Sequence, residues 1–288
     1  MRALVIGAGG QLGRALQATI PATAELVAPP RSDCDLSNAV QLERWLGDTR
    51  PDVVFNAAAY TAVDAAEHDE ATARLVNAIA VGRLAEAARH HGARLVHVST
   101  DFVFDGETSR PYAPDDAPNP LNAYGRTKRE GEVAVLQSGA DALIVRTAWV
   151  HFEHGRNFVH TMLRLMRERD EVGVVSDQIG APTYARNLAR ALWLLAERPA
   201  GGFYHFTDSG VASWYDFAVA IREEATAAGI VRDAAPIVPI RTDDYPTAAR
   251  RPRFSVLDNS KTWSALGTRG QHWREALREM LGRIDRNG

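Results

Sequence analysis

Residues 2–13 of the chain read RALVIGAGGQLG, and this stretch decides the fold class. The apolar run 2–6 predicts a short buried strand, and the leucine spacing of 11–20 predicts an amphipathic helix directly after it. Between them stand three glycines at intervals of three residues, Gly7, Gly10 and Gly13. Such glycines let the backbone approach a pyrophosphate, whose charge the helix amino terminus attracts. A tight turn that merely needs glycine is the alternative, but the position after the first strand favours a dinucleotide site.

Apolar runs and helical patterns alternate on either side of Tyr124, through the first half of the chain. Further strands are expected at 24–30, 51–59, 94–100 and 141–150, and further helices at 39–49, at 70–92 and from about Tyr124. This alternation predicts an α/β fold, a Rossmann-like doubly wound parallel sheet with helices on both faces. After residue 150 the pattern loosens, with helices expected at 157–170, 185–197, 213–228 and 272–284. We therefore expect two parts, a nucleotide-binding domain over 1–150 and a smaller C-terminal α/β substrate-binding domain over 151–288, with about 172–198 returning to the sheet.

Composition and charge narrow the function classes. The 288 residues include 33 Lys+Arg and 36 Asp+Glu, for a net charge of -3. Neither a nucleic acid nor an anionic membrane is therefore predicted as a partner. No uncharged apolar stretch reaches the roughly 18 residues of a membrane span. Cys34 is the single cysteine, so no disulfide can form within the chain, which agrees with the reducing cytoplasm that we expect as its location.

The end of the second expected strand bears on the choice of cofactor. NAD-binding sites usually carry an acidic residue there, which holds the ribose 2'-hydroxyl. Here the place is taken by Arg31 and Ser32, and an arginine can receive a 2'-phosphate. We therefore predict NADPH, with NADH as the alternative cofactor. Asp33 remains able to bind a ribose, and an arginine in a solvated loop is the other interpretation of Arg31.

Tyr124 and Lys128 form the pair of residues that suggests a reaction. Lys128 is one of only two lysines in the chain, and residues four apart share a helix face. A lysine cation beside a phenol is expected to lower the tyrosine pKa, so that the tyrosine can give a proton to a carbonyl oxygen. Ser99 and Thr100 follow the strand at 94–100, where a hydroxyl can bind the same carbonyl. Chance spacing on a solvated helix, and the start of a turn, are the competing interpretations.

Together these residues resemble the extended short-chain dehydrogenase/reductase family, and within it the reductases of dTDP-linked 4-keto sugars. The resemblance covers nearly the whole chain, and its most specific segments are STDFVFDG (99–106), PLNAYGRTK (120–128), DQIGAPT (177–183) and ARRPRFSVLD (249–258). It implies NADPH-dependent reduction of the C4 ketone of dTDP-6-deoxy-L-lyxo-4-hexulose to dTDP-L-rhamnose. Thr100, Tyr124 and Lys128 match the catalytic triad of the family. Tyr124 would donate the proton, while Lys128 would also hold the nicotinamide ribose.

The resemblance also implies binding residues. Those expected to contact the cofactor, besides Arg31, Tyr124 and Lys128, are Gly7, Gly10, Gln11, Leu12, Asp35, Leu36, Ala57, Ala58 and Tyr60. Those expected to contact the sugar nucleotide are Thr61, Val63, Phe102 and Trp149. The segment with Arg250, Arg251 and Arg253 can meet a diphosphate, and we take Arg250 as its contact. A solvated basic loop and core packing of Trp149 are the other interpretations.

Some positions depart from the family pattern. Phe102 replaces a tyrosine, and His151 stands where an aromatic residue is usual. Some members of the family dimerise around magnesium held by glutamates, but the matching positions here are Ala15 and Arg186, so we predict no metal. A homodimer is the assembly that we expect. The remaining histidine clusters show no metal-ligand spacing and are interpreted as surface residues, namely His90, His91, His151 and His154.

Four other functions compete with this one. A sugar-nucleotide 4,6-dehydratase would carry a second acidic residue after Asp101, where this chain has Phe102, and a C4-epimerase matches the C-terminal segments poorly. A 4-ketoreductase of another deoxysugar pathway is the serious enzymatic alternative. A non-catalytic NADP-binding regulatory subunit is the alternative from a different class, and the intact Thr100, Tyr124 and Lys128 argue against it.

Overall fold

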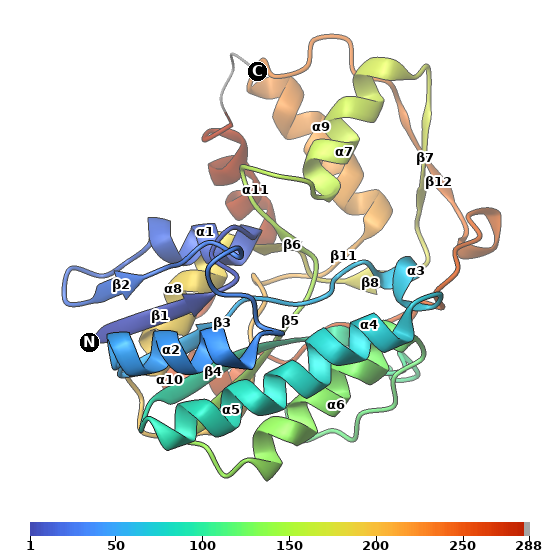
Figure 1. Cartoon of the computed structure of the whole chain (residues 1–288). Helices are drawn as coiled ribbons and strands as arrows, with labels where there is room; N and C mark the ends of the chain where they lie inside the picture. Colours follow the sequence, from blue (N-terminus) through green and yellow to red (C-terminus); the bar gives the residue numbers. More distant parts are fainter. Residues whose placement is uncertain (285–288) are drawn as a thin grey trace.

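A parallel sheet of six strands forms the centre of the computed structural model, which describes residues 1–284 (Figure 1). The strand order is β10-β5-β4-β3-β1-β2. The order reverses direction beside β1, which is the arrangement that places a ligand crevice at the carboxyl ends of the strands. The strands are β1 (Arg2–Ile6), β2 (Glu25–Val27), β3 (Val53–Asn56), β4 (Arg94–Thr100), β5 (Ala142–Thr147) and β10 (Gly202–His205).

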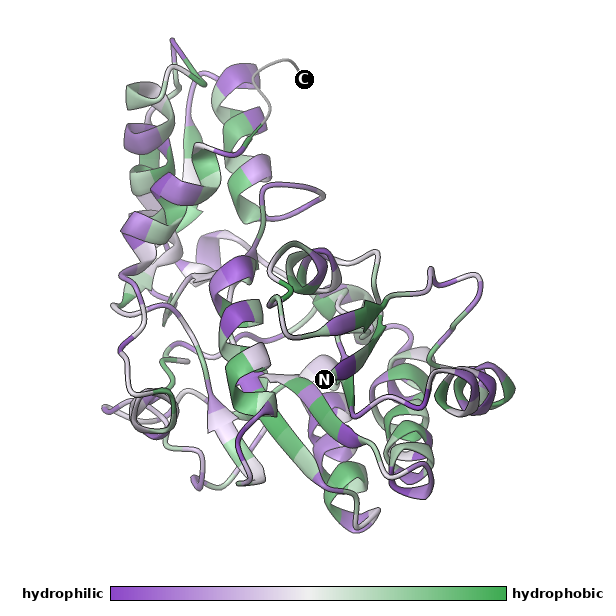
Figure 2. Cartoon of the chain, turned by 90° about the vertical axis from the view of Figure 1, so that its left-hand side faces the viewer, coloured by the Kyte–Doolittle hydropathy of each residue, from purple (hydrophilic) through white to green (hydrophobic). Residues whose placement is uncertain are grey.

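Helices cover both faces of this sheet because successive side chains of each strand point to opposite sides. Ala3 and Val5 of β1 pack in one apolar cluster with α1 and α8, whereas Leu4 and Ile6 pack in a second cluster with α2 and α5. Figure 2 shows the strands mostly in the hydrophobic colour and the helices with one hydrophobic side. The predicted α/β, doubly wound fold is therefore confirmed. The helices concerned are α1 (Gln11–Ala18), α2 (Ala39–Thr49), α5 (Ala80–His90), α6 (Ala123–Gln137) and α8 (Ala185–Ala196).

The helix expected at 70–92 contains an irregular turn. Its parts are α4 (Glu70–Arg74), a π-helical turn η1 (Leu75–Ile79) and α5. Within the π turn, Asn77 is fully buried and contacts two other segments. Its Oδ1 accepts from the backbone N–H of Tyr60 at 2.8 Å, and its Nδ2 donates to the Tyr60 carbonyl and to Thr127 Oγ1 at 3.1 and 3.2 Å. The irregular turn thus ties the loop after β3 to α6.

The strand expected at 141–150 is interrupted. It is divided into β5 and β6 (Val150–His151), because Trp149 has a left-handed backbone with φ of 46°. β6 leaves the sheet and pairs with β9 instead. His151 was expected on the surface, but it is buried between the rings of Tyr184 and Phe217, so that prediction is wrong.

A second group of elements lies beside the sheet, with α7 and α9 farthest from it in Figure 1. Of the segment 172–198, α8 packs on α1 against the sheet, whereas its short strands pair elsewhere, and the strand that returns to the sheet is β10. The domain boundary at residue 150 stays a prediction. Helices here are α7 (Phe158–Glu168), α9 (Trp214–Ala227) and α11 (Trp273–Leu281), whereas α10 (Ser260–Leu266) packs on β10 of the sheet. Strands are β7 (Val172–Val175), β8 (Ile179–Gly180), β9 (Thr183–Tyr184), β11 (Ala212–Ser213) and β12 (Ile237–Ile240).

Three short helical segments complete the description, α3 (Val63–Ala66), η2 (Asp101–Val103) and η3 (Thr242–Asp244). The first two lie on the loops that follow β3 and β4, at the end of the sheet where the strands finish. Within residues 1–284, no helix combines the length and apolar character needed to cross a membrane.

Candidate functional site

A cleft of about 860 Å³ lies at the carboxyl ends of the central strands. It collects residues from the loops after β1, β2, β3, β4 and β5, together with α6. All the residues that the sequence predicted for catalysis or for the cofactor line this cleft, namely Gly7, Gly10, Gln11, Leu12, Arg31, Asp35, Leu36, Ala57, Ala58, Tyr60, Thr100, Tyr124 and Lys128. Their grouping places the glycine loop and Tyr124 in one cavity.

The glycine loop after β1 leaves no room for side chains at Gly7 and Gly13. Gly7 has a φ of 87°, and a Cβ on it would lie 2.6 Å from the backbone nitrogen of Ala58. A Cβ on Gly13 would lie 2.2 Å from the Gly7 carbonyl oxygen. At Gly9, by contrast, a Cβ would meet nothing within 4 Å among the described residues. The loop is therefore packed tightly on its protein side and open on the cleft side, where the amino terminus of α1 can meet an anion.

Arg31 and Asp35 stand together at one rim of the cleft. Arg31 Nε donates to Asp35 Oδ2 at 2.9 Å, although most of the Arg31 side chain is exposed. A hydrogen bond from the Ser37 backbone and the contact with Arg31 hold the pKa of Asp35 below its usual value. The pair therefore places a guanidinium at the rim of the cleft.

Thr100 and Tyr124 meet at the other end of the cleft. Asn122 caps α6 by accepting from the Gly125 N–H at 2.8 Å, which fixes the first turn that carries Tyr124. Thr100 Oγ1 donates to Asp101 Oδ1 at 3.0 Å and accepts from the Phe102 N–H at 3.2 Å. Burial raises the pKa of Tyr124 to about 12, against a smaller lowering by its hydrogen bond with Thr100. Tyr124 therefore keeps its proton at neutral pH.

Lys128 lies one turn farther along α6, where it lines the cleft and is 2% exposed. Its Nζ donates to the Val98 carbonyl at 2.7 Å and lies 3.5 Å from His97 Nε2. Burial lowers the pKa of Lys128 to about 8, while the charge of Glu132 acts to raise it. The predicted lowering of the Tyr124 pKa by Lys128 is not what the structure gives, because burial of the phenol outweighs other influences on its pKa.

The sequence reasoning assigned no role to three buried polar residues at this end of the cleft. Asn56 ends β3 and His97 lies beside it on β4, with Asn56 Nδ2 3.0 Å from His97 Nδ1. Asp101 directly follows Thr100 and is 3% exposed, and burial raises its pKa to about 6. Asp101 carried a usable signal, since an acidic residue next to a strand-end threonine stands at the ligand edge of the sheet. Asn56 and His97 carried no such signal, because their contact depends on the register between β3 and β4.

The structure brings only some of the predicted substrate residues into the cleft. Thr61 and Trp149 line the cleft, whereas Val63, Phe102 and Arg250 are not among its lining residues. Phe102 nevertheless packs edge-on against Tyr124, with ring centroids 5.9 Å apart. The Arg250 side chain is exposed and comes within 4.0 Å of Glu107. Their roles toward a substrate stay predictions.

Trp149 and Arg251 both make contacts with other side chains of the protein. The Trp149 ring stacks on Trp214 with centroids 3.5 Å apart, so one of its faces is covered. Arg251 donates to both carboxylate oxygens of Asp64, at 3.0 and 2.7 Å. Gly180 packs against the Trp149 ring as well, since a Cβ on it would lie 2.7 Å from Trp149 Cε2, and Trp149 reaches the cleft beside these two contacts. Arg251 positions the loop that carries Arg250.

Metal-binding side chains do not cluster in this structure. Within residues 1–284, no group of three or more His, Cys, Asp or Glu side chains is arranged to hold an ion. Ala15 is fully buried in the core, and Arg186 Nε donates to Glu153 Oε1 at 2.6 Å.

Comparisons with known proteins agree with this geometry. A family model described as RmlD substrate binding domain matches residues 1–286. A dTDP-4-dehydrorhamnose reductase from Burkholderia thailandensis is 47% identical, over 96% of this chain and 97% of that protein. The enzyme of the same name from Escherichia coli is 40% identical, over 99% of this chain and 98% of that protein. A crystal structure of dTDP-4-dehydrorhamnose reductase from Bacillus anthracis in complex with NADP has a TM-score of 0.92 and 34% identity, covering 98% of this chain and 99% of that one.

The motifs quoted above resembled a family of dTDP-sugar reductases, and that resemblance is confirmed over the whole length of the match. With the family model spanning almost all of its residues and relatives at 40% identity or more, the chain belongs to the RmlD substrate binding domain family.

Proposed function

We propose that the protein is an NADPH-dependent reductase that converts the C4 ketone of dTDP-6-deoxy-L-lyxo-4-hexulose (dTDP-4-dehydro-L-rhamnose) to the hydroxyl of dTDP-L-rhamnose. The observation that carries the proposal is the placement of Thr100, Tyr124 and Lys128 in the same cleft as the glycine loop. The names of the relatives support the choice of substrate. One relative, from Streptomyces niveus, is named dTDP-4-keto-6-deoxy-D-glucose reductase, so a related 4-keto sugar is the second candidate substrate.

The cofactor side of the cleft fits a dinucleotide. The tight packing around Gly7 and the open space beside Gly9 leave the start of α1 accessible to a pyrophosphate. Arg31 at the rim suits a 2'-phosphate, which supports NADPH over NADH. When bound there, NADPH supplies the hydride. The residues that would hold it are the predicted cofactor residues that line the cleft.

The chain's own residues supply the proton. The raised pKa keeps the Tyr124 phenol protonated, so it can give its proton to the C4 oxygen as negative charge develops there. The Thr100 hydroxyl donates to Asp101 and accepts from the Phe102 N–H. To orient the carbonyl, it would turn its single hydrogen from Asp101 to the C4 oxygen. Lys128 lies one helical turn from Tyr124 on α6, and its ammonium group is suited to supply a further proton.

The substrate side is proposed to be formed by Thr61, Val63, Phe102, Trp149 and Arg250. The exposed Arg250 guanidinium is suited to meet the diphosphate of a sugar nucleotide. Trp149 lines the cleft, where its indole is suited to contact the sugar nucleotide.

The test is NADPH oxidation, followed by the nicotinamide absorbance, with dTDP-6-deoxy-L-lyxo-4-hexulose as substrate and NADH in parallel. Tyr124→Phe removes only the phenolic hydroxyl and should lower kcat by about 10²–10⁴-fold. Tyr245→Phe makes the same change at an exposed tyrosine and should leave kcat unchanged. A wild-type protein that binds NADPH but turns over neither this ketone nor the 4-keto-6-deoxy-D-glucose derivative would contradict the proposal.

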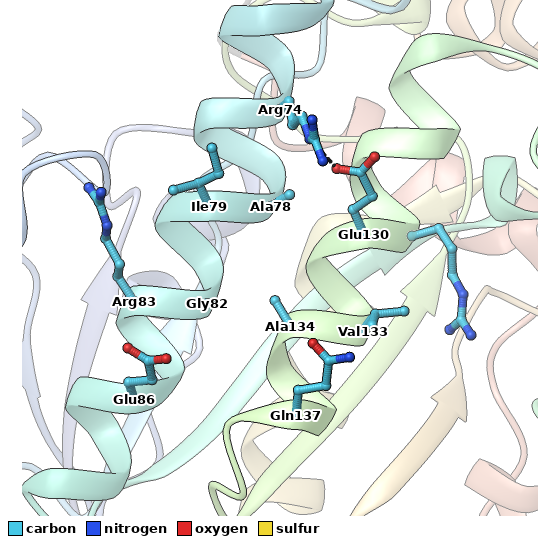
Figure 3. Close-up of a pocket in the computed structure, with 11 residues that line it drawn as sticks. Arg74, Ala78, Ile79, Gly82, Arg83, Glu86, Glu130, Val133, Ala134 and Gln137 are labelled. Carbon is cyan, nitrogen blue, oxygen red and sulfur yellow. Dashed lines mark hydrogen bonds and ion pairs between the residues drawn. The ribbon is translucent and has the colours of Figure 1, made fainter.

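We also propose that the protein forms a homodimer through the groove along η1, α5 and α6 (Figure 3). Small residues line this groove, including Ala78, Gly82 and Ala134, and Ile79 at its edge is 45% exposed. Charges of both signs border it, including the Arg74–Glu130 ion pair, which allows a face to pair with its own copy. Light scattering on the eluting protein should give a dimer for wild type and a monomer for Ile79→Asp; a monomeric wild type would refute the proposal.

A further inference from the structure

The protonation of Lys128 is linked to a chain of buried polar groups that crosses the sheet behind it. Asn56 on β3 and His97 on β4 are paired residues in neighbouring strands, and both are at most 1% exposed. His97 lies between Asn56 and Lys128, within 3.0 Å of the Asn56 amide and 3.5 Å of Lys128 Nζ.

The hydrogen bond at Asn56 determines the direction of those that run from Asn56 through His97 to Lys128. The Ala58 N–H donates to Asn56 Oδ1 at 3.2 Å, so the Asn56 Nδ2 is the atom that faces His97. An amide nitrogen only donates, and therefore His97 Nδ1 must accept and carries no hydrogen. The neutral ring then has its hydrogen on Nε2, directed at Lys128. The doubly protonated ring is excluded as well, since burial holds the pKa of His97 well below its usual value.

Because the hydrogen on His97 Nε2 is directed at Lys128, it affects the ammonium and the neutral amine forms of Lys128 differently. An ammonium group has three donors and no lone pair, so it is opposed by the Nε2–H of His97. A neutral amine can accept from His97 Nε2 and still donate to the Val98 carbonyl, which lies 2.7 Å away. Two other ionisable groups of α6, Tyr124 and Glu132, lie near Lys128. Glu132 is paired with both Arg129 and Arg146.

We propose that His97, oriented by Asn56, is a positioning residue that makes the Lys128 ammonium a readier proton donor. The proposal rests on the proposed reductase function. After Tyr124 has given its proton to the C4 oxygen, the Lys128 ammonium passes a proton toward the phenolate, and the N–H bond of lysine breaks as the O–H bond of tyrosine forms. The resulting amine accepts the hydrogen bond from His97 Nε2, and a proton from solvent water later restores the ammonium.

The experiment is a pH titration of lysine side chains labelled with carbon-13 at Cε, followed by NMR without any turnover. The chain has only two lysines, so Lys261 gives the reference signal and Lys261→Arg assigns Lys128. In the wild type, Lys128 should titrate near pH 8. His97→Gln places an acceptor toward lysine, and Asn56→Asp reverses the histidine tautomer; each should raise the Lys128 pKa by roughly one unit.

The matched control is His151→Gln, which changes an equally buried histidine whose neighbours are Trp149, Tyr184 and Phe217; it should leave the Lys128 pKa unchanged. An unchanged Lys128 pKa in both test variants would overturn the proposal. A nitrogen-15 spectrum of the wild-type histidines tests it without any substitution, since a His97 tautomer with its hydrogen on Nδ1 would also overturn it. Neither readout depends on the substrate, so a failure here is distinct from a failure of the reductase function.

Discussion

Replacing Asp101 by asparagine should stabilise the protein by an amount that depends on pH. Asp101 is buried, its Oδ2 has no hydrogen-bond partner among the described residues, and its pKa rises from 3.8 to about 6. At about 1.36 kcal/mol for each pKa unit, ionisation of Asp101 costs the folded state about 3 kcal/mol once both states are charged. An asparagine at this position does not ionise and has no such cost.

The sign follows from the protons bound in each state. Below pH 3.8 the carboxyl is neutral in both states and has no effect on stability. Between pH 3.8 and about 6 the unfolded chain has lost the proton and the folded chain still holds it, so wild-type stability falls as pH rises. The ionisation cost at Asp101 is therefore about 1 kcal/mol at pH 4.5 and about 3 kcal/mol at pH 7.5.

The assay is urea unfolding of wild type and Asp101→Asn at these two pH values, with Asp115→Asn as an exposed control. The asparagine side chain of the variant keeps an oxygen for the Thr100 hydroxyl, and any cost of burying its amide nitrogen is the same at both pH values. The gain in unfolding free energy should therefore be about 2 kcal/mol larger at pH 7.5 than at pH 4.5. An equal effect at both values would refute the reasoning, since the carboxyl would then titrate alike in both states.

Three further outcomes are expected. Arg146→Met removes the guanidinium that lies 2.8 Å from buried Glu132 and leaves Arg129, 2.9 Å away, as the remaining cationic partner. The unfolding free energy should fall by about 3 kcal/mol, whereas the double variant Arg146→Met with Glu132→Met should lose much less. Similar losses for the two variants in urea titrations would contradict this. Gly131→Ala would place a Cβ 2.0 Å from a backbone carbonyl oxygen of the π turn and should therefore lower Tm, whereas Gly9→Ala should not. Equal Tm values for the two variants would contradict the close packing of α6 on the π turn. Finally, kcat should fall as pH rises through about 8, because Lys128 then loses its proton; a flat profile from pH 6.5 to 9.5 would show that its ammonium is not needed.

Much of the fold was predictable because local signals agreed with tertiary packing. The helix expected at 39–49 has those bounds, since Asn38 caps its start and Arg50 ends it in the left-handed region. The strand expected at 94–100 also matches, because its apolar run is buried on both faces. The exceptions are set by distant contacts. Trp149 adopts its unusual φ where it stacks on Trp214, 65 residues away in the chain, and periodicity within one segment carries no such information.

The same distinction holds for the candidate site. The glycine loop and the Tyr124–Lys128 pair were found because each is a local pattern of residue types. The environment of that pair was not, since the enclosure of Tyr124 that raises its pKa comes from neighbours brought together by the fold. Likewise, the contact between Asn56 and His97 joins positions 41 residues apart and depends on strand register. Spacing can indicate which groups react, while their pKa values depend on packing.

The π-helical turn has a consequence for how the helix 70–90 tolerates changes in length. An α-helix turns by about 100° for each residue, so removing one residue from η1 would restore regular hydrogen bonding but rotate α4 relative to α5. Asn77 would then leave its position between Tyr60 and Thr127. The extra residue thus sets the phase between two helical faces, and a one-residue gap at this point would separate the loop after β3 from α6.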